Sequence, residues 1–172
     1  MFVDFDLKGE AKKERTKREI KELMVDVIGF IYSKLSAICP NSIKILDSGG
    51  GAYFLIDHTV TSPIAKEFEG NDRGLVFKDL MQRYNDLLSK IEEEIERRFK
   101  IKGIAEIDTL NHKNRLMKTP LSIHKSMPYV VHPIDPENID FEPVEIPISF
   151  DVFIESMRWV SKHPSKNKRK RI

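Results

Sequence analysis

Two long amphipathic helices alternate with short strand-like segments in this chain of 172 residues, and that order constrains the fold more than any other feature. In residues 10–38 and 75–99, apolar residues recur at spacings of three and four, which predicts two helices with one apolar face each. Strands are predicted around them, at residues 2–6, 42–46, 52–56 and 103–107. The resulting order, β-α-β-β-α-β, is that of a split βαβ unit.

We therefore expect an α/β (α+β) fold of the RRM-like or ferredoxin-like kind, with the long helices packed on one face of the sheet. A third helix is predicted at residues 150–160, and further short strands at residues 115–118 and 127–131. With 40% hydrophobic residues, residues 1–161 are expected to form a single domain, and residues 162–172 a flexible basic tail.

The composition indicates the protein's cellular location more clearly than its chemistry. The chain has 29 basic and 27 acidic residues, so its net charge of +2 creates no global field that selects a partner. A single cysteine, Cys39, excludes an internal disulfide framework. Because there is no apolar run of about 18 residues and no signal peptide, we expect a cytoplasmic protein without a membrane partner, associated with the nucleoid in an archaeal cell.

The first strand carries two acids on one face. Side chains alternate along a strand, so Asp4 and Asp6 point one way while Val3 and Phe5 point to the core. Two adjacent carboxylates repel each other and need cations or water. A divalent metal site is one interpretation, and a solvated outer face of an edge strand is the other.

A third acid, Asp108, ends the strand at residues 103–107, with Glu106 on the same face. The first and last strands of a split βαβ sheet can be neighbours, so Asp108 can complete a cluster with Asp4 and Asp6. Hard oxygen donors of this kind suit Mg²⁺ or Mn²⁺. The alternative for Asp108 and Glu106 is a turn cap or a surface group.

Two segments are candidates for anion binding. The run from Ser48 to Gly51 can present a hydroxyl group and the backbone amides of Gly49 and Gly50 to a phosphate, although such runs are more often simple turns. The second segment gathers basic and hydroxyl side chains around Pro120, which favours a phosphate chain: Arg115, Lys118, Ser122, His124 and Lys125.

Together these motifs resemble the small catalytic subunits of the archaeo-eukaryotic primase superfamily. That family has a D-x-D strand, a Ser-Gly-rich segment ending in histidine, a later Asp, and a stretch such as RLxRxPxSxHxKTG. Here Asp4 and Asp6 match the first motif, Ser48 to Gly51 the second and Asp108 the third, while LMKTPLSIH at residues 116–124 matches the fourth.

The resemblance implies a primase catalytic-core fold and template-directed primer synthesis by two-metal-ion phosphoryl transfer. Asp4, Asp6 and Asp108 would hold the metals, and the glycine run and the segment around Pro120 would hold the nucleoside triphosphate. The implied partners are DNA, nucleoside triphosphates and a primase large subunit or another replication protein. Two departures stand out: either Tyr53 or Phe54 takes the place of the family histidine, and Lys125 precedes the expected lysine position by one residue.

Two other functions stay open from the residues alone. One is a primase-like module that binds nucleic acid or a partner without polymerising, and the other is a metal-dependent phosphohydrolase or nuclease. The basic tail is interpreted as an arm that contacts template phosphates, with a solubilising end as the alternative. Its candidate contacts are Lys168, Arg169, Lys170 and Arg171, with Arg115 in addition.

Overall fold

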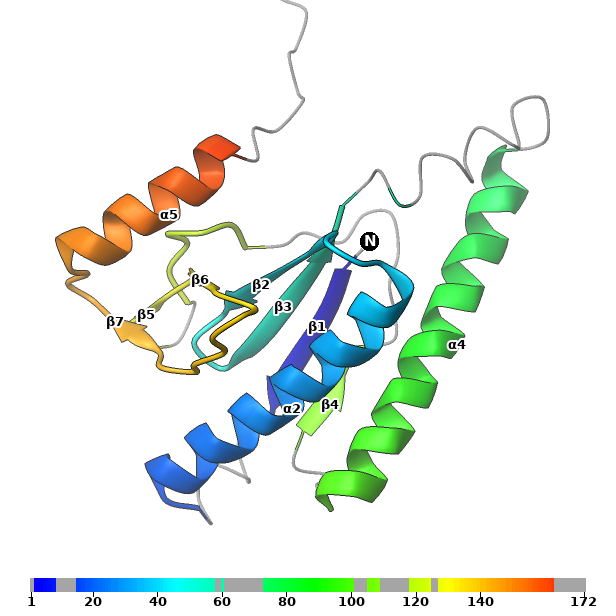
Figure 1. Cartoon of the computed structure of the whole chain (residues 1–172), viewed down its shortest axis with the longest axis horizontal. Coiled ribbons are helices and arrows are strands. Elements are labelled where there is room, and N and C mark those ends of the chain that lie inside the picture. Colours follow the sequence, from blue (N-terminus) through cyan, green and yellow to red (C-terminus); the bar gives the residue numbers. More distant parts are fainter. Residues whose placement is uncertain are drawn as a thin grey trace, which may run out of the picture.

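A computed structural model of the chain describes residues 2–8, 15–57, 60, 73–100, 105–108, 118–124 and 127–162. Its centre is a five-stranded antiparallel sheet in the order β4-β1-β3-β2-β6, and two long helices pack against it (Figure 1). The fold is therefore α+β. Its strands are β1 (Phe2–Leu7), β2 (Ile43–Asp47), β3 (Gly51–Ile56), β4 (Ala105–Ile107) and β6 (His132–Ile134).

The first six elements run β1-α2-β2-β3-α4-β4, with helices α2 (Lys17–Ile38) and α4 (Arg73–Phe99). Each helix connects two strands that are separated in the sheet by a third, so the strand order β4-β1-β3-β2 follows. The predicted order of elements is confirmed in this part of the chain. The extra strand β6 extends the sheet at the β2 edge, where Pro133 is tolerated because an edge strand needs fewer ladder donors.

Helix α2 begins at a capping box. The Thr16 hydroxyl accepts a hydrogen bond from the Glu19 backbone N–H, and the Glu19 carboxylate accepts one from the Thr16 backbone N–H at 2.8 Å. This satisfies amides that the first helical turn cannot pair internally. The predicted helix at residues 10–38 therefore starts at Lys17 among the described residues, and residues 9–14 lie outside them.

The core lies between the sheet and the two long helices. Helix α2 contributes a buried stripe of apolar side chains spaced by three or four residues, and α4 contributes a second one. Strand side chains complete it, among them Val3 and Phe5 of β1 and Phe54 of β3. The helical members are Met24, Val27, Ile28, Ile31 and Leu35 of α2 and Tyr84, Leu88, Ile91 and Ile95 of α4.

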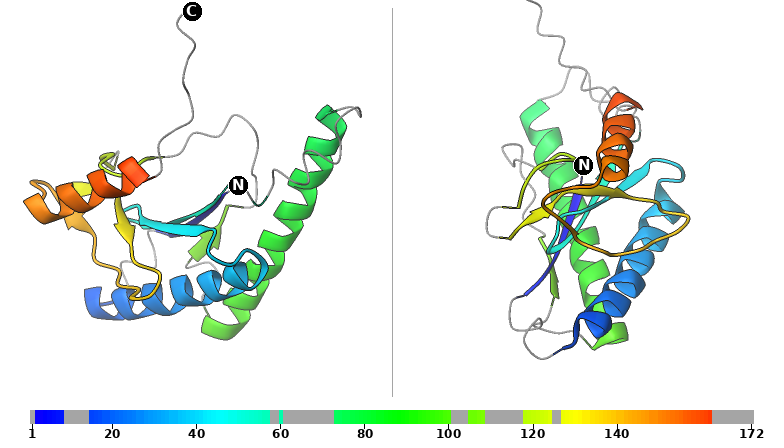
Figure 2. Two further views of the ribbon diagram at one scale, coloured as in Figure 1. Left: turned by 45° about the horizontal axis from the view of Figure 1, so that its top comes forward. Right: turned by 90° about the vertical axis from the view of Figure 1, so that its left-hand side faces the viewer.

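The two long helices share one face of the sheet, as predicted, whereas the shorter helix α5 (Phe150–Lys162) packs on the other face. It lies across the sheet from α2 (Figure 2, left), and Trp159 packs against a separate cluster of Leu46, Tyr53 and Val131. Leu46 and Tyr53 alternate with the core residues of their strands, so they point to the other face. Helix α5 packs on this face because the Trp159 indole ring covers these apolar side chains, which point away from the two long helices.

The Pro-rich stretch after residue 131 is more ordered than predicted. Besides β6 it contains β7 (Val144–Glu145), which pairs with β5 (Tyr129–Val130) in a small second sheet. Of the strand predicted at residues 115–118, Lys118 is not in a strand, and the rest lies outside the described residues. No helix in the described part of the chain is long and apolar enough to cross a membrane.

Candidate active site

The sheet brings the acids of β1 and β4 together. The antiparallel pairing of Phe5 with Ile107 and Asp6 with Glu106 continues to Asp108, whose backbone N–H donates to the Asp4 carbonyl oxygen at 2.9 Å. Residues directly opposite each other across antiparallel strands share a face, with Cβ atoms about 4.5–5.5 Å apart. Asp4, Asp6, Glu106 and Asp108 therefore lie on the face opposite the buried Phe5 and Ile107.

The four acids differ in their surroundings. Asp6 is exposed, whereas Asp4 and Asp108 are half-buried. Glu106 is engaged by the Lys8 ammonium group, with 2.6 Å between Nζ and Oε2. The remaining three are the aspartates that the sequence singled out.

Helix α4 anchors the β4 edge of this cluster. The Glu92 carboxylate accepts a hydrogen bond from the Ile107 backbone N–H at 3.0 Å. Burial raises the pKa of Glu92, and the bond from Ile107 opposes that rise. Glu92 thus attaches the residue next to Asp108 to helix α4. The sequence reasoning missed Glu92 because its only local signal is an acid on the charged side of a helix.

The donor set of Asp4, Asp6 and Asp108 fits a hard divalent cation in chemistry, because carboxylate oxygens are the ligands that Mg²⁺ and Mn²⁺ prefer. Within the described residues, no three His, Cys, Asp or Glu side chains converge closely enough to hold a metal as they stand. Binding would therefore require rotation of these side chains, for which the exposed Asp6 has room.

The loop between β2 and β3 uses much of its own hydrogen-bonding capacity. The Gly51 N–H donates to the Ser48 hydroxyl at 3.1 Å, and the Gly49 N–H donates to Asp47 Oδ1 at 2.6 Å. Ser48, Gly49 and Gly50 are all buried. The Gly49 amide and the Ser48 hydroxyl group, both expected to face an anion, are therefore already engaged within the loop.

Gly51 brings this loop against β1. A Cβ atom at Gly51 would lie 1.9 Å from the Phe5 carbonyl oxygen and 2.7 Å from Asp6 Oδ1. Real side chains do not tolerate such contacts, so only glycine lets β3 pass this close to the acids. Gly51 thus contributes to the acidic cluster by letting the backbone of β3 lie close to Asp6.

Tyr129 joins the glycine loop to the segment around Pro120. Gly49 has a φ of 84° and packs under the Tyr129 side chain, whose Cβ would lie 2.6 Å from a Cβ on Gly49. The Tyr129 carbonyl oxygen accepts the His124 backbone N–H at 2.8 Å. Two predicted phosphate-binding segments that are far apart in sequence are therefore neighbours. A tyrosine in a strand gives no sequence signal for such a role.

The segment around Pro120 is a compact turn. The Ser122 hydroxyl accepts the Thr119 backbone N–H at 3.1 Å, and Leu121 has a φ of 69°. Lys118, Ser122 and His124 are all half-buried. The other basic candidates lie outside the described residues: Arg115, Lys125, Lys168, Arg169, Lys170 and Arg171.

The register of β3 decides between the two aromatic residues that replace the family histidine. Tyr53 lies opposite Asp4 on the acidic face, whereas Phe54 lies opposite Val3 and is fully buried in the core. Tyr53 therefore occupies the position beside the carboxylates. It is almost completely buried, because it also packs in the cluster beneath Trp159.

Searches against protein-family models, curated proteins and solved structures found no significant match to this chain.

Proposed function

We propose that the protein is a metal-dependent nucleotidyltransferase of the primase and polymerase type, which synthesises or extends a primer on a DNA template. The observation that carries the proposal is the pairing of Asp108 with Asp4. It unites an isolated acid with a distant D-x-D pair on one face, in the arrangement that the resemblance to primase small subunits implies.

Asp4, Asp6 and Asp108 would hold Mg²⁺ or Mn²⁺. When bound, the ions would supply activation of a 3′-hydroxyl group and neutralisation of charge on the reacting phosphates. The three carboxylates supply the negative charge that attracts the ions. Phe5 and Ile107, buried behind them, hold the two strands in register. No side chain needs to act as a covalent nucleophile in such a transfer.

Lys118, Ser122 and His124 are proposed to bind the triphosphate. They lie on a turn fixed to the glycine loop through Tyr129, and that loop in turn contacts Asp6 across Gly51. This continuous set of contacts supports a site in which cationic and hydroxyl groups face one end of a nucleotide and the acids face the other. Because two loop amides are engaged internally, Lys118 and His124 carry most of the proposed phosphate binding.

The implied partners are a DNA template and nucleoside triphosphates, with a primase large subunit or another replication protein as a further candidate. The basic residues Lys168 to Arg171 are proposed to contact template phosphates. A location in the cytoplasm fits these partners.

The presence of Tyr53 favours a second candidate, a primase-like module that binds template without polymerising. A buried phenol cannot supply the cation that a histidine can, which weakens phosphate binding beside Asp4. Incorporation of labelled nucleotide with Mg²⁺ or Mn²⁺, on primed and unprimed single-stranded DNA, separates the two. Incorporation that Asp6→Asn abolishes supports the transferase, template binding without incorporation supports the module, and metal-dependent loss of the template indicates a nuclease.

A further inference from the structure

Asp47 is the only charged side chain that is fully buried in the described part of the chain. It ends β2 on the core side of the sheet, directly beside the glycine loop. Its Oδ1 accepts the Gly49 N–H at 2.6 Å, while its Oδ2 has no hydrogen-bond partner among the described residues. A buried carboxylate oxygen without a donor is costly, so this arrangement calls for a physical reason.

The residue directly opposite Asp47 on the neighbouring strand, His132, is a candidate partner. The register of β2 and β6 places His132 directly opposite Asp47, so the two side chains share a face, with Cβ atoms about 4.5–5.5 Å apart. Its Nδ1 is also buried and without a partner in this part of the chain, while the ring forms a hydrogen bond with the Val130 backbone. Two buried side chains, each with one unsatisfied polar atom, thus lie opposite each other across the strands.

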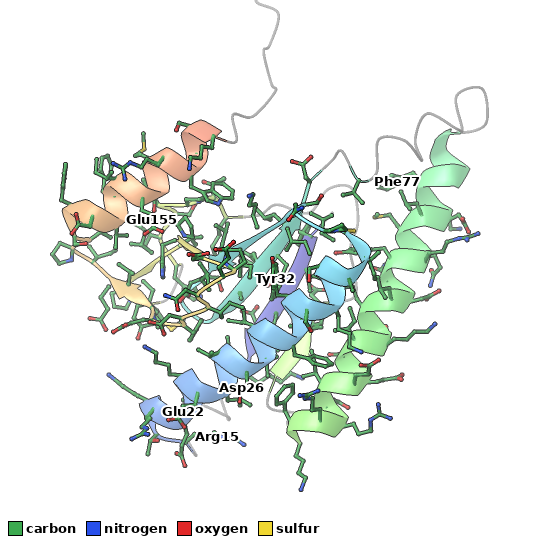
Figure 3. All side chains as sticks on the ribbon, in the orientation of Figure 1. Arg15, Glu22, Asp26, Tyr32, Phe77 and Glu155 are labelled. Carbon is green, nitrogen blue, oxygen red and sulfur yellow. The ribbon has the colours of Figure 1, made fainter. Side chains whose placement is uncertain are left out.

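The surroundings of this pair shift the pKa of both groups. Burial lowers the pKa of the His132 imidazole, and the negative charge of Glu155 in helix α5 (Figure 3) opposes that change. Burial raises the pKa of Asp47 to about 7, against the hydrogen bond from Gly49, which lowers it. Burial therefore favours the neutral form of both the carboxyl group and the imidazole ring.

Protonation changes what this pair can do. A neutral Asp47 can donate from Oδ2 to His132 Nδ1, directly or through one buried water, and still accept the Gly49 N–H at Oδ1. An ionised Asp47 loses that donor and becomes an unpaired buried charge, which is stabilised only if water reaches it. Displacement of the adjacent loop, whose Gly49 N–H contacts Asp47, would let water reach the carboxylate.

The loop is the element that connects both halves of the proposed site. Gly49 lies under Tyr129, which accepts the His124 N–H, and Gly51 passes against Asp6. A shift of Gly49 away from Asp47 would therefore move the triphosphate side relative to the acids.

We propose that Asp47 is a positioning residue: its protonated carboxyl group, linked to His132, holds the loop from Ser48 to Gly51 in the form that binds nucleotide. The role in nucleotide binding rests on the proposed function, whereas the proton-linked loop does not. Ionisation of Asp47 releases the loop and weakens triphosphate binding.

The first test follows the loop without any ligand. The chain has 8 glycines, so selective ¹⁵N-glycine labelling gives a small set of amide signals in which Gly49 can be assigned. The signals of Gly49 and Gly51 are expected to shift together between pH 6 and 8, with a midpoint near 7. Asp47→Asn keeps the acceptor for Gly49, offers an N–H to His132 and cannot ionise, so its signals are expected not to move over this range.

The second test measures binding of a nonhydrolysable nucleoside triphosphate with Mg²⁺ at pH 6 and pH 8. The native protein is expected to lose at least fivefold in affinity, and Asp47→Asn less than twofold. A glycine titration that persists in Asp47→Asn, or is missing from the native protein, overturns the whole inference. A titration with equal affinities at both pH values overturns the positioning role. A titration without triphosphate binding at either pH contradicts the proposed function and leaves the proton-linked loop standing.

Discussion

The backbone N–H of Asp108 donates to the carbonyl oxygen of Asp4 at 2.9 Å, and this contact fixes two aspartates from distant parts of the sequence on one face of the sheet. It continues a register in which each residue of β4 faces a residue of β1 with the same orientation. The acids are therefore held by backbone pairing, and their positions do not depend on attraction between the side chains, which repel each other.

Neutralising one acid is expected to remove function without loss of stability. Asp6→Asn and Asp108→Asn should each lower nucleotidyl transfer by on the order of 100-fold or more, while the free energy of unfolding changes by less than about 0.5 kcal/mol or rises slightly. Relief of like-charge repulsion offsets the lost hydration. Urea denaturation and the incorporation assay measure the two effects. A large loss of stability would indicate a structural role instead.

The Glu92 carboxylate is expected to stabilise β4 by accepting the hydrogen bond from the Ile107 N–H. Glu92→Ala leaves the Ile107 N–H without its partner and should reduce stability by about 1–2 kcal/mol. Glu92→Gln retains a carbonyl oxygen in the same place and should cost less than half of that. Equal losses in the two variants, measured by urea denaturation, would show that the hydrogen bond is unimportant.

The two glycines at Gly51 and Gly29 are expected to respond in opposite directions to alanine. Gly51→Ala would place Cβ 1.9 Å from the Phe5 carbonyl oxygen, so separation of β1 from β3 should cost at least about 3 kcal/mol. Gly29 is inside helix α2, where a Cβ atom would lie an ordinary 3.9 Å from Ile139, and alanine should stabilise by up to about 1 kcal/mol. Thermal unfolding of both variants measures these changes in stability. A Gly51→Ala variant as stable as the native protein would contradict the close approach of Gly51 to the Phe5 carbonyl oxygen.

Stability is expected to fall as the pH rises from about 4 to about 7 because of Asp47. Its pKa rises from 3.8 to about 7 on folding, so the unfolded state binds fewer protons between these values. The native state is favoured fully below pH 4, and this advantage is lost as the pH approaches 7. At about 1.4 kcal/mol for each pH unit, the upper bound is roughly 4 kcal/mol. Denaturation at pH 5 and pH 8 should show this slope, and Asp47→Asn should reduce it.

Local patterns predicted the helices and the paired strands, because each has a clear period and the first six elements follow an order with few topological solutions. Pairing of Asp4 with Asp108 followed from that topology. Helix α5 could not be placed in the same way: an amphipathic pattern states that one face is buried, but not against which side of the sheet. Only the contact of Trp159 with Leu46 and Tyr53 decides it.

The contacts that assemble the candidate site were harder to predict. Asp47 precedes a glycine run and reads as part of a turn, and its burial depends on β6, a strand whose proline argued against it. Tyr129 and Glu92 act through backbone groups of residues distant in sequence. Such contacts leave no periodic signal.

The most direct test of the metal site is Mn²⁺ binding followed by electron paramagnetic resonance. The native chain is expected to bind Mn²⁺, and Asp6→Asn and Asp108→Asn are expected to weaken binding at least tenfold. Glu106→Gln is the matched control, because Glu106 lies on the same face but is engaged by Lys8, and its affinity should stay within twofold of native. A native chain that binds no Mn²⁺, or an Asp108→Asn variant that binds it equally well, would contradict a metal-dependent site at these three aspartates.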